Sequence, residues 1–137
     1  MILVDTSAWV ELDRATESPV DLRLTALLAS PGGIAVTEAV VAEVAAGART
    51  DEREDALRAL LGRCWLLPLD SAADFDAGAT IYRHCRAAGI TPRGLLDCVI
   101  AAVAIRHDVP ILAHDLDLAR IAEVTSLRLD AATLRPA

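Results

Sequence analysis

Four acidic residues interrupt segments of the chain that are otherwise apolar. Asp5 follows an apolar tetrapeptide at the N-terminus, and Asp115 follows Pro-Ile-Leu-Ala-His. Glu43 and Asp97 each lie in a run rich in Ala, Val and Ile. A carboxylate is costly to bury unless it is paired, hydrogen-bonded or bound to a metal ion. Because few basic residues lie near these acids in the sequence, we interpret them as one shared site for a divalent cation.

The chemistry expected of such a site is phosphodiester hydrolysis. Carboxylate oxygens are the ligands that Mg²⁺ and Mn²⁺ prefer, and the sequence has no Cys or His cluster that would favour zinc. A cation with open coordination positions lowers the pKa of a bound water and orients a phosphate. Arginine side chains near the site, Arg93 or Arg14 among them, are candidates to hold the flanking phosphates.

The N-terminal acid and its neighbours also have structural explanations. Asp5 can cap the helix that follows it, although Thr6 and Ser7 offer capping oxygens of their own. Thr6 and Ser7 start a helix first, and only second are they candidates to hold a metal-bound water or a phosphate. His114 is either a turn residue or a base.

The other acids have similar alternatives. Glu43 can face solvent, and Glu38 competes with it, although an acid in a first helical turn is explained by the helix dipole. Asp97, Asp115 and Asp117 can all be first-turn acids of their helices. Each residue alone is a weak signal, and the argument for a site rests on their joint occurrence.

Short apolar segments alternate with helical patterns along the chain. We expect strands at residues 2–5, 34–36, 64–69, 111–113 and 127–129, the third at a sheet edge because it contains Pro68. We expect helices at residues 7–12, 19–29, 37–46, 51–61, 71–88, 95–107 and 115–122. This order predicts an α/β fold with three α/β/α layers and a short, mainly parallel sheet of four to five strands. We expect one domain over residues 1–137.

This architecture explains how distant acids meet. Sites in open parallel sheets form beyond the carboxyl ends of the strands. Asp5 ends the first strand and Asp115 follows the fourth, so both reach the same crevice. Glu43 and Asp97 lie on helices that can pack against it.

Composition limits the class of protein. Apolar residues make up 54 % of the 137 residues and aromatic residues 3 %, so the core must consist of Leu, Val, Ile and Ala. The net charge of −7 argues against a general nucleic-acid binder but not against a nuclease whose acids hold cations. The three cysteines lack metal or disulfide spacing, and no segment has the length of a signal peptide or a membrane span. We therefore expect a cytoplasmic protein without membrane contact.

The order of these motifs resembles the PIN-domain ribonucleases, most closely the VapC-type toxins of bacterial type II toxin–antitoxin pairs. The resemblance rests on Asp5-Thr-Ser after the first strand, Glu43 in Ala-Glu-Val-Ala-Ala-Gly, Asp97 heading Asp-Cys-Val-Ile-Ala-Ala-Val-Ala, and Asp115-Leu-Asp117 after Ile-Leu-Ala-His. It covers roughly residues 1 to 130. Two positions depart from the family pattern: His114 stands where Thr, Ser or Asn is common, and Leu118 replaces a common aromatic residue.

The resemblance implies an endoribonuclease that depends on Mg²⁺ or Mn²⁺ and acts as a toxin by inhibiting translation and growth. The metal ligands it implies are Asp5, Glu43, Asp97 and Asp115, with Asp117 as an additional acid and Thr6 in support. Asp5 and Asp97 are expected to hold the principal ion. The implied substrate is RNA, with transfer RNA as the first expectation. A homodimer and a cognate antitoxin with a basic segment are the implied partners.

Three alternative functions differ from this one in what they require of the sequence. A non-catalytic module could use the acidic groove to bind a basic peptide, and it would not depend on a divalent metal. A phosphoryl-accepting receiver domain needs an active-site Lys, and the chain has none. A haloacid-type phosphatase needs a second Asp two positions after the first, where this chain has Ser7.

Overall fold

The computed structural model describes residues 1–30 and 32–137. Its strands are β1 (Ile2–Val4), β2 (Ile34–Val36), β3 (Trp65–Leu66) and β4 (Ile111–Leu112). Its helices are α1 (Thr6–Asp13), α2 (Pro19–Leu28), α3 (Glu38–Gly47), α4 (Asp51–Leu61), α5 (Ser71–Ala87), α6 (Leu95–Arg106) and α7 (Leu116–Val124).

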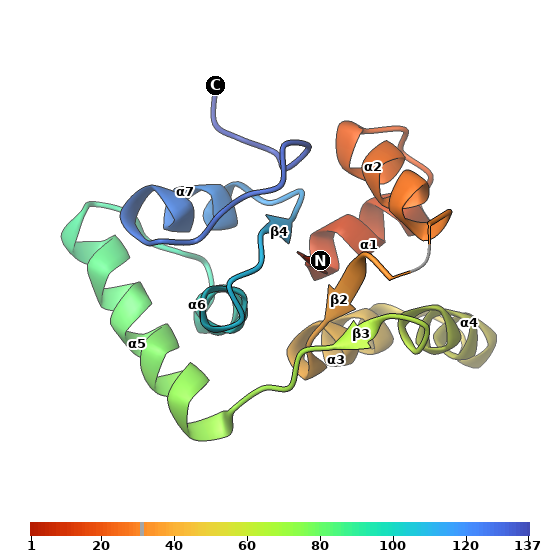
Figure 1. The fold of residues 1–137 in the computed structure, drawn as a ribbon, viewed down its shortest axis with the longest axis horizontal. Coiled ribbons are helices and arrows are strands. Elements are labelled where there is room, and N and C mark those ends of the chain that lie inside the picture. Colours follow the sequence, from red (N-terminus) through yellow and green to blue (C-terminus); the bar gives the residue numbers. More distant parts are fainter. Residues whose placement is uncertain (31) are drawn as a thin grey trace.

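The four strands of the described residues form one parallel sheet in the order β3-β2-β1-β4. Figure 1 shows α1 to α4 on one side of the strands and α5 to α7 on the other. Parallel neighbours require helical crossovers, and these crossovers cover both faces of the sheet. The predicted α/β fold with three layers and a short parallel sheet is confirmed.

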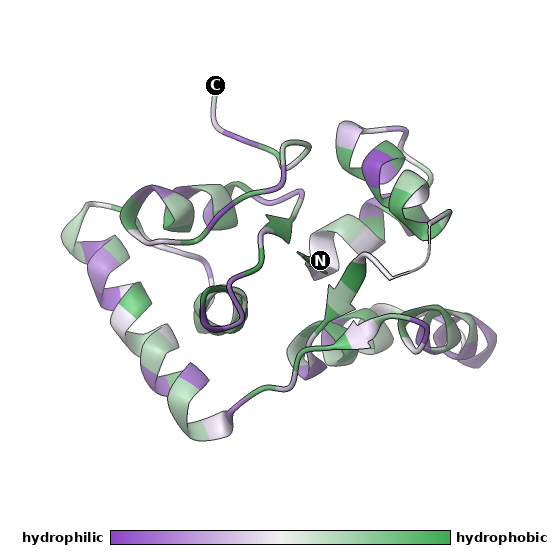
Figure 2. Cartoon of the chain, viewed as in Figure 1, coloured by the Kyte–Doolittle hydropathy of each residue, from purple (hydrophilic) through white to green (hydrophobic). Residues whose placement is uncertain are grey.

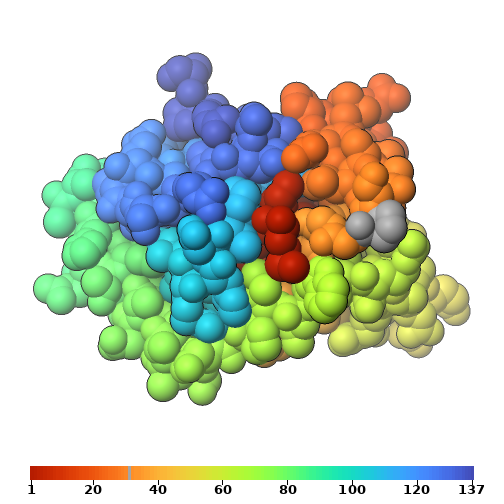
Figure 3. Space-filling model, in the orientation of Figure 1, coloured from red at the N-terminus to blue at the C-terminus, as the bar shows by residue number. Residues whose placement is uncertain are grey.

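The central strand is β1, which pairs with β2 on one side and β4 on the other. Figure 3 shows the red N-terminal residues between the orange segment of the first half and the cyan and blue segments of the second half. All residues of β1, β2 and β4 are buried, whereas both residues of β3 are exposed. The edge position expected for the third strand is confirmed.

The core is aliphatic, as the composition predicted, and Figure 2 shows β2 and β4 in the green of hydrophobic residues. Helix α6 is buried along its middle, from Cys98 to Ala104, as expected of a helix that is apolar on nearly all sides. It packs so closely on α5 that a Cβ atom added at Gly78 of α5 would lie only 2.8 Å from Cγ2 of Val99 in α6. This close packing fixes the helix that carries Asp97.

Two helices are capped by a carboxylate that directly precedes them. Helix α1 begins at Thr6, and its N-cap is Asp5, whose carboxylate accepts the Ser7 amide. Helix α5 is capped by Asp70, not by Ser71. In both cases the carboxylate accepts amide hydrogens of the first turn, although a hydroxyl side chain lies within two residues of it.

The last predicted strand, residues 127–129, is not a regular strand. Leu129 forms only an isolated bridge with Ile111. After this bridge the Thr133 hydroxyl accepts the amide of Ala113 and donates to the carbonyl of Ile111. These are backbone groups that a longer strand pairing with β4 would have used. Among the described helices, none combines the length and the apolar character needed to cross a membrane.

Candidate active site

The carboxyl ends of β1 and β4 meet where the acids gather. Asp5 follows β1 directly, and its amide donates to the carbonyl of Leu112, the last residue of β4. Asp115 is the N-cap of α7, three residues beyond that strand. The negative charges of Asp115 and Glu43 help to raise the pKa of Asp5, which shows that these side chains act on one another.

Asp5 is a buried carboxylate with one oxygen engaged and one free. Its Oδ2 atom accepts hydrogen bonds from the Ser7 amide at 3.0 Å and the Ser7 hydroxyl at 2.6 Å. Its Oδ1 atom is buried and has no hydrogen-bond partner in the part of the chain described. Burial raises the pKa of Asp5 to about 6, against the opposing effect of the Ser7 hydrogen bonds. The free oxygen is a ready position for a cation.

Asp97 lies in the first turn of α6 and is half-buried. Burial, and then the charges of Asp5, Asp115, Glu43 and Asp117, raise its pKa to about 7. A first-turn acid would gain from the helix dipole alone, but that effect is smaller than the crowding of like charges here. The structure therefore brings the acids predicted for the site into electrostatic contact around Asp97.

Glu43 reaches this region from the middle of α3, on the opposite helical layer. The Thr6 hydroxyl donates to its Oε1 atom at 2.7 Å, and both side chains are half-buried. The competing residue, Glu38, instead accepts the amide of Leu69. Thr6 thus orients Glu43, whereas Glu38 binds the backbone of the segment that follows β3.

Asp115 and Asp117 are bound by an arginine. The terminal Nη2 atom of Arg93 lies 3.1 Å from both oxygens of Asp115, and its Nε atom lies 3.0 Å from Oδ2 of Asp117. The backbone amide of Arg93 donates to the same Asp117 oxygen at 3.0 Å. Burial alone would raise the pKa of Asp117, but these bonds with Arg93 hold it below its ordinary value.

Ser7 and His114 connect the ends of β1 and β4. The amide of His114 donates to the Ser7 hydroxyl at 2.9 Å, and that hydroxyl donates to Asp5. The His114 ring faces Glu11, with 3.5 Å between Nε2 and Oε1. From the sequence we expected Ser7 mainly to start a helix, and its position beside Asp5 was missed. The available signal was its place two residues after an Asp that ends a strand.

The donor set fits a hard cation in its chemistry, with several carboxylates and one free buried oxygen. Yet within residues 1–30 and 32–137, no three acid, His or Cys side chains stand arranged to ligate one ion together. In the same structure Thr6 engages Glu43, and Arg93 engages Asp115. The roles of Asp5, Glu43, Asp97, Asp115 and Asp117 as metal ligands stay a prediction.

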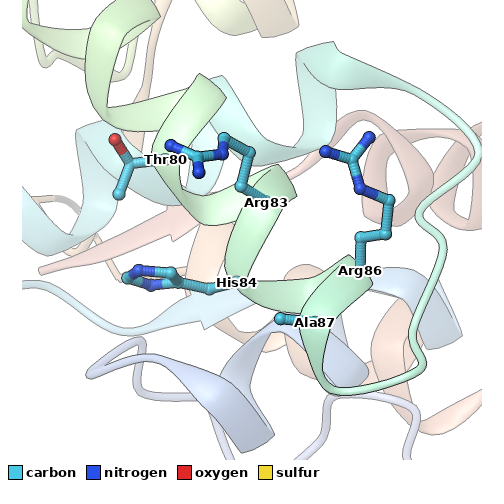
Figure 4. Close-up of a pocket in the computed structure, with 5 residues that line it drawn as sticks. All are labelled: Thr80, Arg83, His84, Arg86 and Ala87. Carbon is cyan, nitrogen blue, oxygen red and sulfur yellow. The ribbon is translucent and has the colours of Figure 1, made fainter.

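A groove of about 670 Å³ runs beside Glu43, between α1 and the α3–α4 connection. Arg14 and Arg49 line it, and neither forms an ion pair with any residue that the structure describes. A second hollow of about 330 Å³ lies on α5, where Figure 4 shows Arg83, His84 and Arg86 with no carboxylate among the lining residues. Only the first hollow adjoins the acids.

The chain was compared with known proteins. The profile of the family described as PIN domain matches residues 2–124. A protein named VapC ribonuclease Mb1587, from Mycobacterium bovis, is 43% identical over 129 residues, which are 93% of this chain and 96% of the relative. Ribonuclease VapC11 from Mycobacterium tuberculosis has the same identity and coverage.

Solved structures with a similar fold are more distant in sequence. VapBC2 from Rickettsia felis, bound to a DNA fragment of its promoter, gives a TM-score of 0.73 at 20% identity and covers 95% of this chain and 98% of that one. Mycobacterium tuberculosis VapC20, described as a sarcin-ricin loop cleaving toxin, gives 0.66 at 22% identity, with 93% and 99% covered. With the family profile over most of the chain and relatives at 43% identity, the chain belongs to the PIN-domain family and is similar to its VapC members.

Proposed function

We propose that this protein is a VapC-type endoribonuclease, the toxin of a toxin–antitoxin pair, and that residues 1–137 act as one domain. The observation that carries the proposal is the cluster of acids at the carboxyl ends of β1 and β4, which includes the buried and unpartnered Oδ1 atom of Asp5. Relatives named as ribonucleases, at 43% identity over nearly the whole chain, support RNA as the substrate.

The proposed cofactor is Mg²⁺, with Mn²⁺ as a substitute. Asp5 and Asp97 would hold the ion, with Glu43 completing the shell directly or through water and Asp115, which Arg93 engages, through water. An ion bound there would supply an activated water and positive charge for phosphodiester hydrolysis. The raised pKa values of Asp5 and Asp97 fit this role, because both carboxylates lack a cation of their own in the described structure.

The chain's own residues position the reacting groups. Ser7 holds one oxygen of Asp5 so that the other is directed away from the hydrogen-bonded side. Thr6 fixes Glu43 across the layer boundary. Asp117 contributes through Arg93 and not as a free acid, because the backbone amide and the Nε atom of Arg93 both donate to its Oδ2 atom. Geometry of this kind keeps the ligands preorganised for the reaction.

RNA is proposed to approach along the groove beside Glu43. Arg14 and Arg49 line this groove and carry no carboxylate partner among the described residues, so their guanidinium groups remain free to bind phosphates. Replacing either by Ala should raise KM for RNA several-fold and leave kcat nearly unchanged. Arg58→Ala is the matched control, because Arg58 pairs with Glu54 on the exposed side of α4.

The decisive assay measures cleavage of total RNA by purified protein with Mg²⁺, with Mn²⁺ and with EDTA. We expect cleavage with either metal and none with EDTA. Metal-independent cleavage would contradict the proposed cofactor. Tight binding of a basic peptide, without any cleavage, would favour the alternative function, a non-catalytic acidic-groove module.

The proposed target is transfer RNA, which follows from the family resemblance. Mapping of new RNA ends after brief expression of the wild type and Asp5→Asn tests it. Ends within transfer RNA would support the proposal. Ends in the sarcin-ricin loop, the target in the description of VapC20, would replace it with a ribosomal target.

The proposed partners are a second copy of the chain and a cognate antitoxin whose basic segment enters the acidic groove. Several of the solved structures with this fold are described as toxin–antitoxin complexes, and the net charge of −7 suits a basic partner. The product of an adjacent small reading frame should suppress cleavage and growth inhibition, and sedimentation velocity should give a dimer. The proposed location is the cytoplasm, where RNA substrates are found.

A further inference from the structure

Arg93 is a cation built into the acid cluster. It lies in the loop before α6, and its side chain is 78% exposed, yet its guanidinium bonds to two different carboxylates. Exposed arginine pairs usually contribute little, because the long side chain must be ordered. Here the contact is a fork: one nitrogen bridges both oxygens of Asp115 and another binds Asp117. Such planar, multidentate contacts define a fixed position for the charge.

The contacts divide the cluster into two parts. Asp115 and Asp117 share Arg93, and Arg120 adds a longer contact of 3.7 Å to Asp117. In the residues described, neither Asp5 nor Asp97 contacts any basic side chain, and the Oδ1 atom of Asp5 has no partner. One part of the cluster is thus already neutralised by the chain, and the other lacks positive charge.

A second metal ion on Asp115 would have to displace this fork. Both oxygens of Asp115 are engaged by Arg93, so an ion that bound them would compete with an arginine whose Nε atom and backbone amide are also bonded to Asp117. Asp5 and Asp97 present no such competitor. The geometry therefore favours a divalent cation at Asp5 and Asp97 and disfavours one at Asp115 and Asp117.

We infer that Arg93 takes the place of a second metal ion, so that the protein binds one divalent cation at Asp5 and Asp97 while Arg93 neutralises and positions Asp115 and Asp117. The inference rests on the proposed metal-dependent function. Arg93 is a positioning residue in this arrangement. The hydrogen bond from its backbone amide to Asp117 also links the segment before α6 to the start of α7. This link helps to fix the position of Asp97 relative to that of Asp115.

Counting bound Mn²⁺ tests the inference without any activity measurement. We expect one Mn²⁺ per chain for the wild type by electron paramagnetic resonance and calorimetry. Arg93→Ala should bind a second Mn²⁺ at least tenfold more tightly than the wild type does. The matched control is Arg120→Ala, which removes the nearby 3.7 Å contact and should keep one ion per chain. Two ions in the wild type, or one in Arg93→Ala, would overturn the inference.

A measurement on the wild type covers the case in which Arg93→Ala does not fold. The ¹⁵Nε–H signal of Arg93 should be resolved and should persist when Mg²⁺ is added to saturation, because the fork stays on Asp117. A shift of that signal, on metal binding, to the position of a solvent-exposed arginine would contradict the inference.

The two proposals fail in different ways. No bound Mn²⁺ in the wild type would remove the metal from the proposed function and the inference with it. Two bound ions with metal-dependent RNA cleavage would leave the proposed function intact and remove only the role of Arg93.

Discussion

The acid cluster has two halves, Asp5 with Asp97 and Asp115 with Asp117. They differ in whether the chain itself supplies a positive charge next to the carboxylates. Asp5 and Asp97 are held together without a cation, and their pKa values rise to about 6 and about 7. Asp117 is just as enclosed as Asp5, yet the bonds from Arg93 lower its pKa. Burial costs the same kind of free energy in both places, and only the second half has the cost offset within the chain. Charge left uncompensated by the fold indicates where an ion from outside belongs.

The largest expected effect separates the two halves by activity. Asp5→Asn and Asp97→Asn should each lower kcat for RNA cleavage by on the order of 10³-fold, because each removes a ligand and a charge at the reacting centre. Asp117→Asn should cost only on the order of 10-fold, because it acts through Arg93. Asp76→Asn, an exposed acid on α5, is the control and should cleave normally. Equal losses in all three site variants would contradict the division.

The next effect concerns Ser7, which positions the free oxygen of Asp5. Ser7→Ala removes the 2.6 Å hydroxyl bond to Asp5 and the link to His114. Loss of an outer-shell partner of this kind typically lowers metal affinity by about 10- to 100-fold. Calorimetry with Mn²⁺ should show that loss for Ser7→Ala. Unchanged affinity would mean that the Ser7 amide alone fixes the carboxylate.

Between pH 5 and pH 8, the stability of the metal-free protein should depend on pH mainly through Asp5 and Asp97. The pKa values of Asp5 and Asp97 are raised from 3.8 to about 6 and about 7, so the folded state binds protons more tightly than the unfolded chain. The stabilisation that comes from protonated Asp5 and Asp97 is complete below about pH 4. It is lost as the pH rises through their folded-state pKa values of about 6 and about 7. Urea unfolding in EDTA should lose on the order of 2 kcal/mol between pH 5 and pH 8.

Asparagine variants sharpen that pH result. At pH 8 without metal, Asp97→Asn should unfold at higher urea than the wild type and should flatten the pH dependence. Asp117→Asn should unfold at lower urea, because its lowered pKa means that the ionised form stabilises the fold at any pH well above 3.8. Destabilisation by Asp97→Asn at pH 8 would show that its charge is compensated after all.

The smallest effect is expected for Arg120. Its contact with Asp117 is long at 3.7 Å, and its side chain is 45% exposed. Exposed pairs of this kind contribute roughly 0 to 1 kcal/mol. Arg120→Ala should therefore change the urea midpoint little and leave cleavage within about twofold, which separates mere proximity to Asp117 from the fork made by Arg93.

The sequence by itself determined the fold class and the acids to test. Short apolar strands that alternate with helices leave few arrangements other than a parallel sheet with helices on both faces. Acids placed directly after strands, or inside apolar helices, were visible because their burial cost does not depend on the details of the fold. Helix caps were harder to place, since Asp5 and Asp70 compete with the hydroxyl beside them over a single position.

Tertiary structure alone decided which partner each acid has. Thr6 and Glu43 are 37 residues apart, Arg93 and Asp117 are 24 apart, and Ser7 and His114 are 107 apart. Arg93 and Arg14 looked equivalent in the sequence, but the fold places one on the acids and the other in the groove. Hydrogen bonds and charges act over a few ångströms in space, and sequence separation carries no information about that distance until the layers have packed.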